Sequence, residues 1–107
     1  MEYGITDEKI QLLVQKIVAG FDPLKVILFG SRAWGNPSQD SDVDLLIIKD
    51  TDISRGDRIR NVHKLIRDIE VPVDVLVYTP SEVARRLSLR DFFVEDIINK
   101  GKVLFSI

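Results

Sequence analysis

The amino-acid sequence predicts an α/β (α+β) fold, in which helices pack on a small mixed β-sheet of about four strands. Short apolar runs at 25–29, 43–49, 71–78 and 102–105 are typical of strands, and stretches with helical apolar spacing alternate with them. The chain has 107 residues, of which 45% are hydrophobic. This size fits one domain, residues 1–107, with a single core.

The first half of the chain is expected to alternate helix and strand. Apolar residues recur at helical spacing up to Ala19, and Gly20 is expected to end that helix. The run from Leu45 to Ile48 is apolar on both faces, so its strand is expected to be central in the sheet. The elements expected here are a helix over 6–19, a strand over 25–29, a short helix over 31–34 and a strand over 43–49.

The second half begins with a helix expected over 54–69, which carries one apolar stripe. Its outer side is expected to be charged, through Arg55, Arg58, Arg60, Lys64, Arg67 and Asp68. A strand over 71–78 is expected to follow. The run Thr-Pro-Ser-Glu at 79–82 has the pattern of a capping box with proline in the first turn, so it predicts a helix to about Leu89.

The C-terminal part is expected to form one more helix and one more strand. The helix is predicted over 90–100, with Gly101 at its end. Its inward-facing side chains are expected to be Phe92, Phe93, Ile97 and Ile98. The strand over 102–105 is expected at an edge of the sheet.

Composition excludes several classes of function. A net charge of -2 and a pI of about 5.3 argue against a broad basic surface, so no direct nucleic-acid binding is expected. The chain has no cysteine and one histidine, which excludes disulfides, thiolate zinc sites and histidine-rich metal sites. No apolar run approaches the roughly 18 residues that cross a membrane, and the N-terminus lacks the order of a signal peptide. A cytoplasmic location is therefore expected, with no membrane contact.

The acidic residues at 42–44 predict a metal site. Side chains two apart on a strand point to one face, so Asp42 and Asp44 are expected to converge at the start of their strand. Two unpaired carboxylates there repel each other, and Mg²⁺ is a natural counter-ion because it prefers carboxylate, water and phosphate oxygens. If strand 71–78 pairs beside strand 43–49, Asp74 joins the cluster. Two ions could then clamp the attacking and leaving oxygens of a phosphoryl or nucleotidyl transfer.

The corner after the first strand is expected to hold phosphate. Gly30 lets the backbone approach a phosphate closely, and the following helix start offers free N–H groups. Ser31 adds a hydroxyl donor, and Arg32 could reach a phosphate with its guanidinium.

Other interpretations of these residues fit less well. A P-loop is excluded because no lysine follows the second glycine of the loop. An EF-hand starting at Asp40 would need glycine and glutamate where Leu45 and Thr51 stand. Aspartyl phosphatases place their aspartates after the apolar strand, whereas here the apolar run follows them. A solvated acidic loop remains an alternative, which Gly30 and Asp74 together disfavour.

These motifs resemble those of the minimal nucleotidyltransferase family, within the DNA polymerase β-like nucleotidyltransferase superfamily. The resemblance rests on I-L-F-G-S-R-A-W-G, then S-D-V-D-L-L-I-I, then V-D-V-L-V, and covers essentially the whole chain. It implies a polymerase β palm-like fold, with Mg²⁺ bound by Asp42 and Asp44. It also implies that Asp74 completes the metal site and helps deprotonate an acceptor hydroxyl. Gly30 and Ser31 would hold the triphosphate of ATP, from which AMP is transferred.

The resemblance also implies a partner. Relatives of this size are often the antitoxin of a pair whose other member is a helical HEPN-type protein, and some transfer AMP to a tyrosine of that partner. One departure concerns Trp34, which stands where relatives often carry an arginine. Loss of that charge would weaken triphosphate binding unless Arg32 replaces it. The alternative hypothesis is therefore a catalytically weak regulatory subunit that neutralises a partner protein by binding it.

Overall fold

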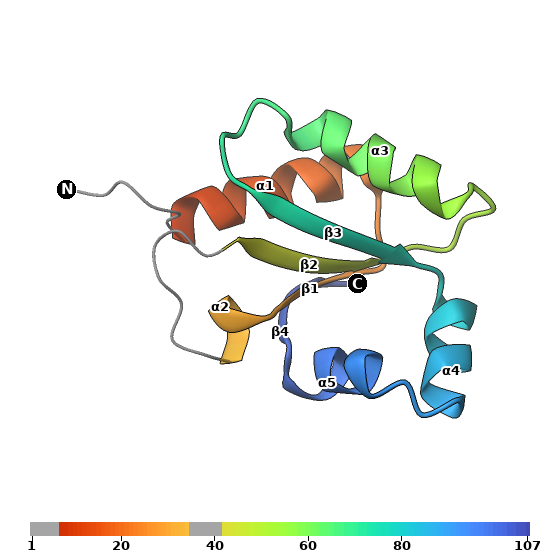
Figure 1. The fold of residues 1–107 in the computed structure, drawn as a ribbon. Helices are drawn as coiled ribbons and strands as arrows, with labels where there is room; N and C mark the ends of the chain where they lie inside the picture. The colour runs from red at the N-terminus through yellow and green to blue at the C-terminus, as the bar shows by residue number, and fades with distance from the viewer. Residues whose placement is uncertain (1–6, 35–41) are drawn as a thin grey trace.

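The computed structural model describes residues 7–34 and 42–107, and it has the mixed α/β fold that the sequence predicts (Figure 1). Helices and strands follow one another in nearly the expected order and positions. The elements are α1 (Asp7–Phe21), β1 (Lys25–Phe29), α2 (Ser31–Trp34), β2 (Val43–Ile48), α3 (Arg55–Ile66), β3 (Val73–Tyr78), α4 (Pro80–Ser88), α5 (Phe92–Lys100) and β4 (Lys102–Ser106).

The four strands form one mixed sheet in the order β3-β2-β1-β4. β1 runs antiparallel to both β2 and β4, whereas β2 and β3 run parallel. The predicted central position of β2 and the predicted edge position of β4 are both confirmed. The parallel pairing matters most for function, because it places the starts of β2 and β3 at the same end of the sheet, where β1 ends.

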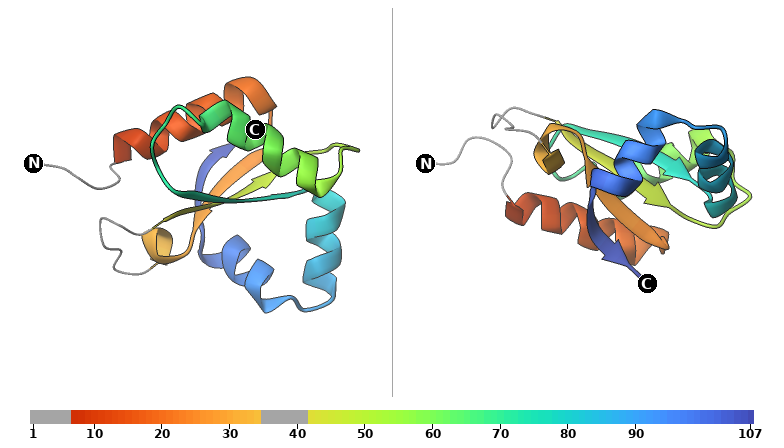
Figure 2. Two further views of the ribbon diagram at one scale, coloured as in Figure 1. Left: turned by 45° about the horizontal axis from the view of Figure 1, so that its top comes forward. Right: turned by 90° about the horizontal axis from the view of Figure 1, so that it is seen from below.

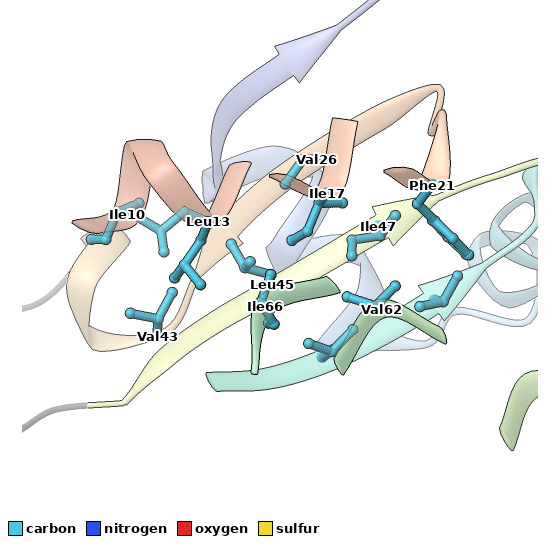
Figure 3. Packing of buried hydrophobic residues seen from close by; sticks show 13 residues of the cluster. Ile10, Leu13, Ile17, Phe21, Val26, Val43, Leu45, Ile47, Val62 and Ile66 are labelled. Atoms are coloured by element: carbon cyan, nitrogen blue, oxygen red, sulfur yellow. The ribbon is translucent and has the colours of Figure 1, made fainter. Parts of the chain in front are cut away.

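Helices cover both faces of the sheet (Figures 1 and 2). α1 and α3 lie on one face, and α4 and α5 lie on the other. Alternate residues of each strand therefore enter different cores. On the first face, Val26 and Leu45 pack against residues of α1 and α3, as Figure 3 shows. On the second face, Ile27 and Leu46 pack with residues of α4 and α5. In the described ranges 7–34 and 42–107, no helix is both long and apolar enough to cross a bilayer.

The predicted end of the first helix at Gly20 is wrong. α1 continues through Gly20 to Phe21 and ends at Asp22, which adopts a positive φ of 53° and donates its N–H to the Val18 carbonyl at 3.2 Å. A Cβ at position 20 would overlap the side chain of Leu65 on α3. Gly20 therefore allows α1 and α3 to approach each other closely, a role that the local sequence does not reveal.

The prediction that the side chains of Phe92 and Phe93 point inward is also wrong. Their exposed fractions are 68% and 53%, and Ile98 is 36% exposed. Asp91 caps α5 by accepting the N–H of Val94, and this start rotates the helix so that Val94 and the correctly predicted Ile97 face the sheet. Two large aromatic side chains are thus left at the surface at the start of α5.

Arg58 is a third correction, because it is buried rather than on the outer side of α3. Only 6% of the residue is exposed. Its guanidinium donates to the carbonyl oxygens of Ile53 at 2.7 Å and Val77 at 3.2 Å, and to Oε1 of Glu82 at 2.7 Å. Glu82 is also part of the predicted capping box with Thr79, which is confirmed. This network joins the start of α3, the end of β3 and the start of α4.

Candidate active site

The predicted carboxylates lie together at one end of the sheet. Asp42 directly precedes β2, Asp44 is its second residue, and Asp74 is the second residue of β3. Asp44 and Asp74 are partners in the parallel register, so their side chains leave the same face of the sheet. This is the face that α4 and α5 cover farther along. The prediction that Asp74 lies close to Asp42 and Asp44 is therefore confirmed. The chemical roles of the three residues stay a prediction.

Electrostatics show that the three carboxylates interact. Burial, then the negative charges of Asp74 and Asp42, and a hydrogen bond with Asp74 raise the pKa of the Asp44 carboxyl above its ordinary value. Each of these causes disfavours the ionised form of Asp44. A cation bound between the carboxylates would oppose them, because it favours the ionised form.

The donor chemistry fits a hard divalent cation, although the arrangement is not a closed ligand set. Among residues 7–34 and 42–107, no group of three histidine, aspartate or glutamate side chains is arranged so that it could hold a metal ion by itself. Carboxylate oxygens at a partly open edge nevertheless suit Mg²⁺, which keeps several water ligands and takes one or two carboxylates together with substrate phosphates. The fit therefore rests on the oxygen donors and on the mutual repulsion at Asp44.

Gly30 shapes the floor of this site. It follows β1 with a positive φ of 78°, and Phe29 just before it pairs with Asp44 across the sheet. A Cβ at position 30 would overlap the Asp44 carboxylate, so only glycine lets that carboxylate lie against the corner. The α2 helix starts at the next residue, and its Ala33 N–H donates to the Gly30 carbonyl at 3.0 Å.

The other predicted phosphate-binding residues lie beside this corner. Ser31 and Arg32 form the first turn of α2, where Ser31 is exposed and Arg32 is partly buried. Figure 1 shows α2 at the end of the sheet where β1 stops and β2 begins. The expectation for the Trp34 side chain lies outside what the structure describes. Contact of Ser31 and Arg32 with phosphate remains a prediction.

Sequence reasoning missed one neighbour of the site. The Phe93 ring packs edge-on against Phe29, with ring centroids 5.7 Å apart, and Phe29 is the strand partner of Asp44. Phe93 is thus an exposed aromatic side chain close to the carboxylates. A helical stripe of apolar residues predicts burial, so the sequence offered no signal for this position.

Comparison with known proteins identifies the family. The family model described as "Polymerase beta, Nucleotidyltransferase" matches residues 8–107. Two proteins of Methanocaldococcus jannaschii are similar in sequence. "Putative protein adenylyltransferase MJ1305" is 47% identical over 67 residues, which cover 62% of this chain and 42% of that protein. "Putative protein adenylyltransferase MJ0604" is 30% identical over 81 residues, which cover 76% of this chain and 77% of that protein.

Solved structures share the fold at low sequence identity. A "putative nucleotidyltransferase" from Sulfolobus solfataricus has a TM-score of 0.66 at 22% identity, covering 92% of this chain and 78% of that one. A toxin-antitoxin with AMP-PNP has a TM-score of 0.60 at 20% identity, covering 96% and 75%. A mutant of the toxin-antitoxin MntA-HpeT gives 0.59 at 18%, covering 96% and 75%.

The match to MJ1305 spans less than half of that protein, whereas the family model covers nearly the whole of this chain. The chain belongs to the polymerase beta nucleotidyltransferase family.

Proposed function

We propose that this protein transfers AMP from ATP to a hydroxyl group of a protein acceptor, with Asp42, Asp44 and Asp74 as its catalytic residues. The acceptor proposed is a tyrosine of a HEPN-type toxin, which would make this chain the antitoxin of a pair. The similar proteins of Methanocaldococcus jannaschii are each named "Putative protein adenylyltransferase", and toxin-antitoxin structures share the fold. The observation that carries the proposal is the register that places Asp44 beside Asp74, next to the Gly30 corner.

The residues have distinct tasks in the proposed reaction. Gly30, Ser31 and Arg32 bind the triphosphate and orient it, which aligns the bond to be broken. The acceptor oxygen attacks the α-phosphorus, the bond from that phosphorus to the β-phosphate oxygen breaks, and pyrophosphate leaves. The exposed Asp74 carboxylate takes the proton of the acceptor hydroxyl.

Nucleotidyltransferases of this family generally use a divalent metal. We propose that Asp42, Asp44 and Asp74 hold Mg²⁺, most simply as two ions. The metal would supply charge neutralisation for the oxygens of the reacting phosphate. Asp44 is central to this arrangement, because it is the least exposed of the three and interacts with both of the other carboxylates.

A labelling experiment with ATP marked at two positions tests the proposed reaction. The protein is incubated with Mg²⁺ and the purified product of the neighbouring reading frame, with ATP labelled at either the α- or the γ-phosphorus. AMP transfer puts only the α-label on the acceptor, since the γ-label leaves with pyrophosphate. Transfer of the γ-label would instead indicate a kinase. Label transfer that survives Asp42→Ala and Asp44→Ala would overturn the proposed catalytic site.

The same experiment separates the second candidate, a regulatory subunit that acts only by binding. Toxin-antitoxin complexes among the structures with this fold favour it as an alternative. In that case the two proteins copurify and toxicity is neutralised, but no label is transferred. Neutralisation would then also persist in the Asp42→Ala and Asp44→Ala variants, whereas a catalytic antitoxin loses it.

Replacing Gly30 with alanine is expected to lower the rate of AMP transfer by about 10²-fold, because the new Cβ displaces the Asp44 carboxylate. The positive φ adds strain of about 1 kcal/mol, so Tm should also fall. Label transfer and thermal unfolding measure the two effects.

Gly56→Ala is the matched control. Gly56 is exposed on α3, and an added Cβ would come no closer than 3.7 Å to the Arg60 side chain. Alanine is the better helix former by about 1 kcal/mol, so this variant should keep wild-type activity and gain stability. A Gly30→Ala protein with wild-type activity would contradict the placement of Asp44 against the corner.

A further inference from the structure

A positively charged pocket lies at the opposite end of β3 from the carboxylates. Its volume is about 410 Å³, and it opens between the start of α3 and one side of α4. The lining residues are Arg55, Glu82, Arg85, Arg86, Leu89 and Asp91. None of them has a part in the nucleotidyl transfer proposed above.

Two of the arginines are held in place by Tyr78. The guanidinium of Arg55 lies 5.1 Å from the centre of the Tyr78 ring, and that of Arg86 lies 4.8 Å from it. Tyr78 itself is only 6% exposed, so it is a fixed platform. Arg86 also contacts Asp91 at 3.1 Å. Such preorganised guanidinium groups lose little freedom when they bind an anion.

The pocket has a surplus of positive charge. Of its two carboxylates, Glu82 pairs mainly with the buried Arg58 at 2.7 Å and only weakly with Arg55 at 3.9 Å. Arg85 has no side-chain partner in the part of the chain that the structure describes, and it is exposed. This concentration of arginine contrasts with the net charge of -2 for the whole chain. The pocket therefore favours an anionic ligand.

The pocket and the carboxylates lie at opposite ends of the same strand. Asp74 and Tyr78 are four positions apart on β3, so both side chains leave the same face. Their α-carbons are separated by about 13 Å at the rise of a strand. β3 is an edge strand, and Leu76 between them is partly exposed. An extended peptide with its hydroxyl at Asp74 would thus reach the pocket about four residues farther along.

We propose that this pocket docks acidic side chains of the protein acceptor, about four residues from the hydroxyl that receives AMP. The proposal rests on the proposed function, since it takes the acceptor to be a protein. Carboxylates of the acceptor pair with the exposed Arg85 and with Arg55, whose guanidinium Tyr78 keeps in position. Docking thus selects acceptors with an acidic segment and adds nothing to the binding of ATP.

Synthetic peptides test the docking site directly. One fluorescein-labelled peptide has a tyrosine, three alanines and two glutamates, and matched peptides carry two alanines or two lysines in place of the glutamates. Fluorescence anisotropy is expected to show that the acidic peptide binds most tightly. Arg85→Glu should weaken its binding about tenfold, since it exchanges an attraction for a repulsion at the surface. Arg67→Glu changes net charge equally at an exposed position outside the pocket, so binding should stay at the wild-type level.

Transfer kinetics supply the second readout. With the α-labelled ATP, Arg85→Glu is expected to raise KM for the acidic peptide about tenfold and to leave KM for ATP unchanged. Equal binding of acidic and neutral peptides, or an equal loss of binding with Arg67→Glu, would overturn the docking site while leaving AMP transfer intact.

The opposite outcome would separate the two proposals in the other direction. If the acidic peptide binds through Arg85 but no acceptor is ever labelled, the docking site stands and the proposed transfer fails. Displacement of the peptide only by inorganic triphosphate, with no preference for glutamate, would assign the pocket to phosphate and overturn the proposal.

Discussion

Asp44→Asn is expected to reduce AMP transfer by about 10³-fold or more and, at the same time, to raise Tm at neutral pH. The loss of activity follows from removing a proposed ligand of the metal beside the reacting phosphate. The gain in stability follows from the raised pKa of Asp44, which burial and the charges of Asp74 and Asp42 cause. Above that pKa the ionised carboxylate destabilises the folded state, and the penalty disappears as the pH falls. Asparagine removes the charge at every pH.

Thermal unfolding with and without Mg²⁺ separates the two effects. A cation that binds the folded wild-type protein raises its Tm by mass action, and Asp44→Asn should abolish most of that increase. Asp52→Asn, in the exposed loop after the other end of β2, is the matched control and should change neither activity nor the response to Mg²⁺. A Tm that falls in Asp44→Asn, or a response to Mg²⁺ that persists, would contradict the view of Asp44 as a repelled carboxylate that binds the metal.

The residues of this site could be brought together from the sequence because strands have strict rules. Alternation places Asp42 and Asp44 on one face at the start of β2, and the run from Leu45 to Ile48, which is apolar on both faces, requires a buried strand. The assumption that β3 pairs beside β2 then fixes Asp74, and the observed register of Asp44 with Asp74 agrees with it. Few arrangements of the strands satisfy these constraints. The local sequence pattern therefore predicts which residues of neighbouring strands lie side by side.

The features that sequence reasoning missed depend on contacts between distant segments. Gly20 suggests a helix end, but α1 continues through it, and the missing side chain leaves the space that Leu65 of α3 fills. Phe93 fits a helical apolar stripe, and only the cap at Asp91 and the position of α5 on the sheet decide that it stays exposed. Neither fact is encoded in the neighbouring residues. The charge pattern of α3 likewise suggests a solvated Arg58, because periodicity cannot identify a buried partner such as Glu82.

Arg58→Met is expected to lower the free energy of unfolding by about 2–3 kcal/mol, a large part of the stability of a small domain. Methionine fills much of the same volume but donates no hydrogen bonds. The carbonyl oxygens of Ile53 and Val77 and the Glu82 carboxylate then lose the Arg58 donor in a largely buried place. In thermal unfolding this corresponds to a fall in Tm of about 10–20 °C. Arg60→Met is the matched control, since Arg60 lies two positions along α3 with an exposed ion pair to Asp57, and its effect should stay within about 0.5 kcal/mol.

The dependence on pH shows whether the Arg58–Glu82 pair is the cause. Burial alone would raise the pKa of Glu82, but hydrogen bonds from the Thr79 N–H and from Arg58, with the charges of Arg58 and Arg55, hold it below its ordinary value. A lowered pKa in the folded state contributes stability above the unfolded pKa of about 4.3, and this contribution is lost as the pH falls through the folded pKa. The difference in stability between wild type and Arg58→Met should therefore be constant near neutral pH and shrink in acid. Adding Glu82→Gln to Arg58→Met should restore part of the stability at neutral pH, because no charge is then left without its partner. A difference that does not change with pH would instead assign the loss to packing, since a methionine differs from arginine in shape at any pH.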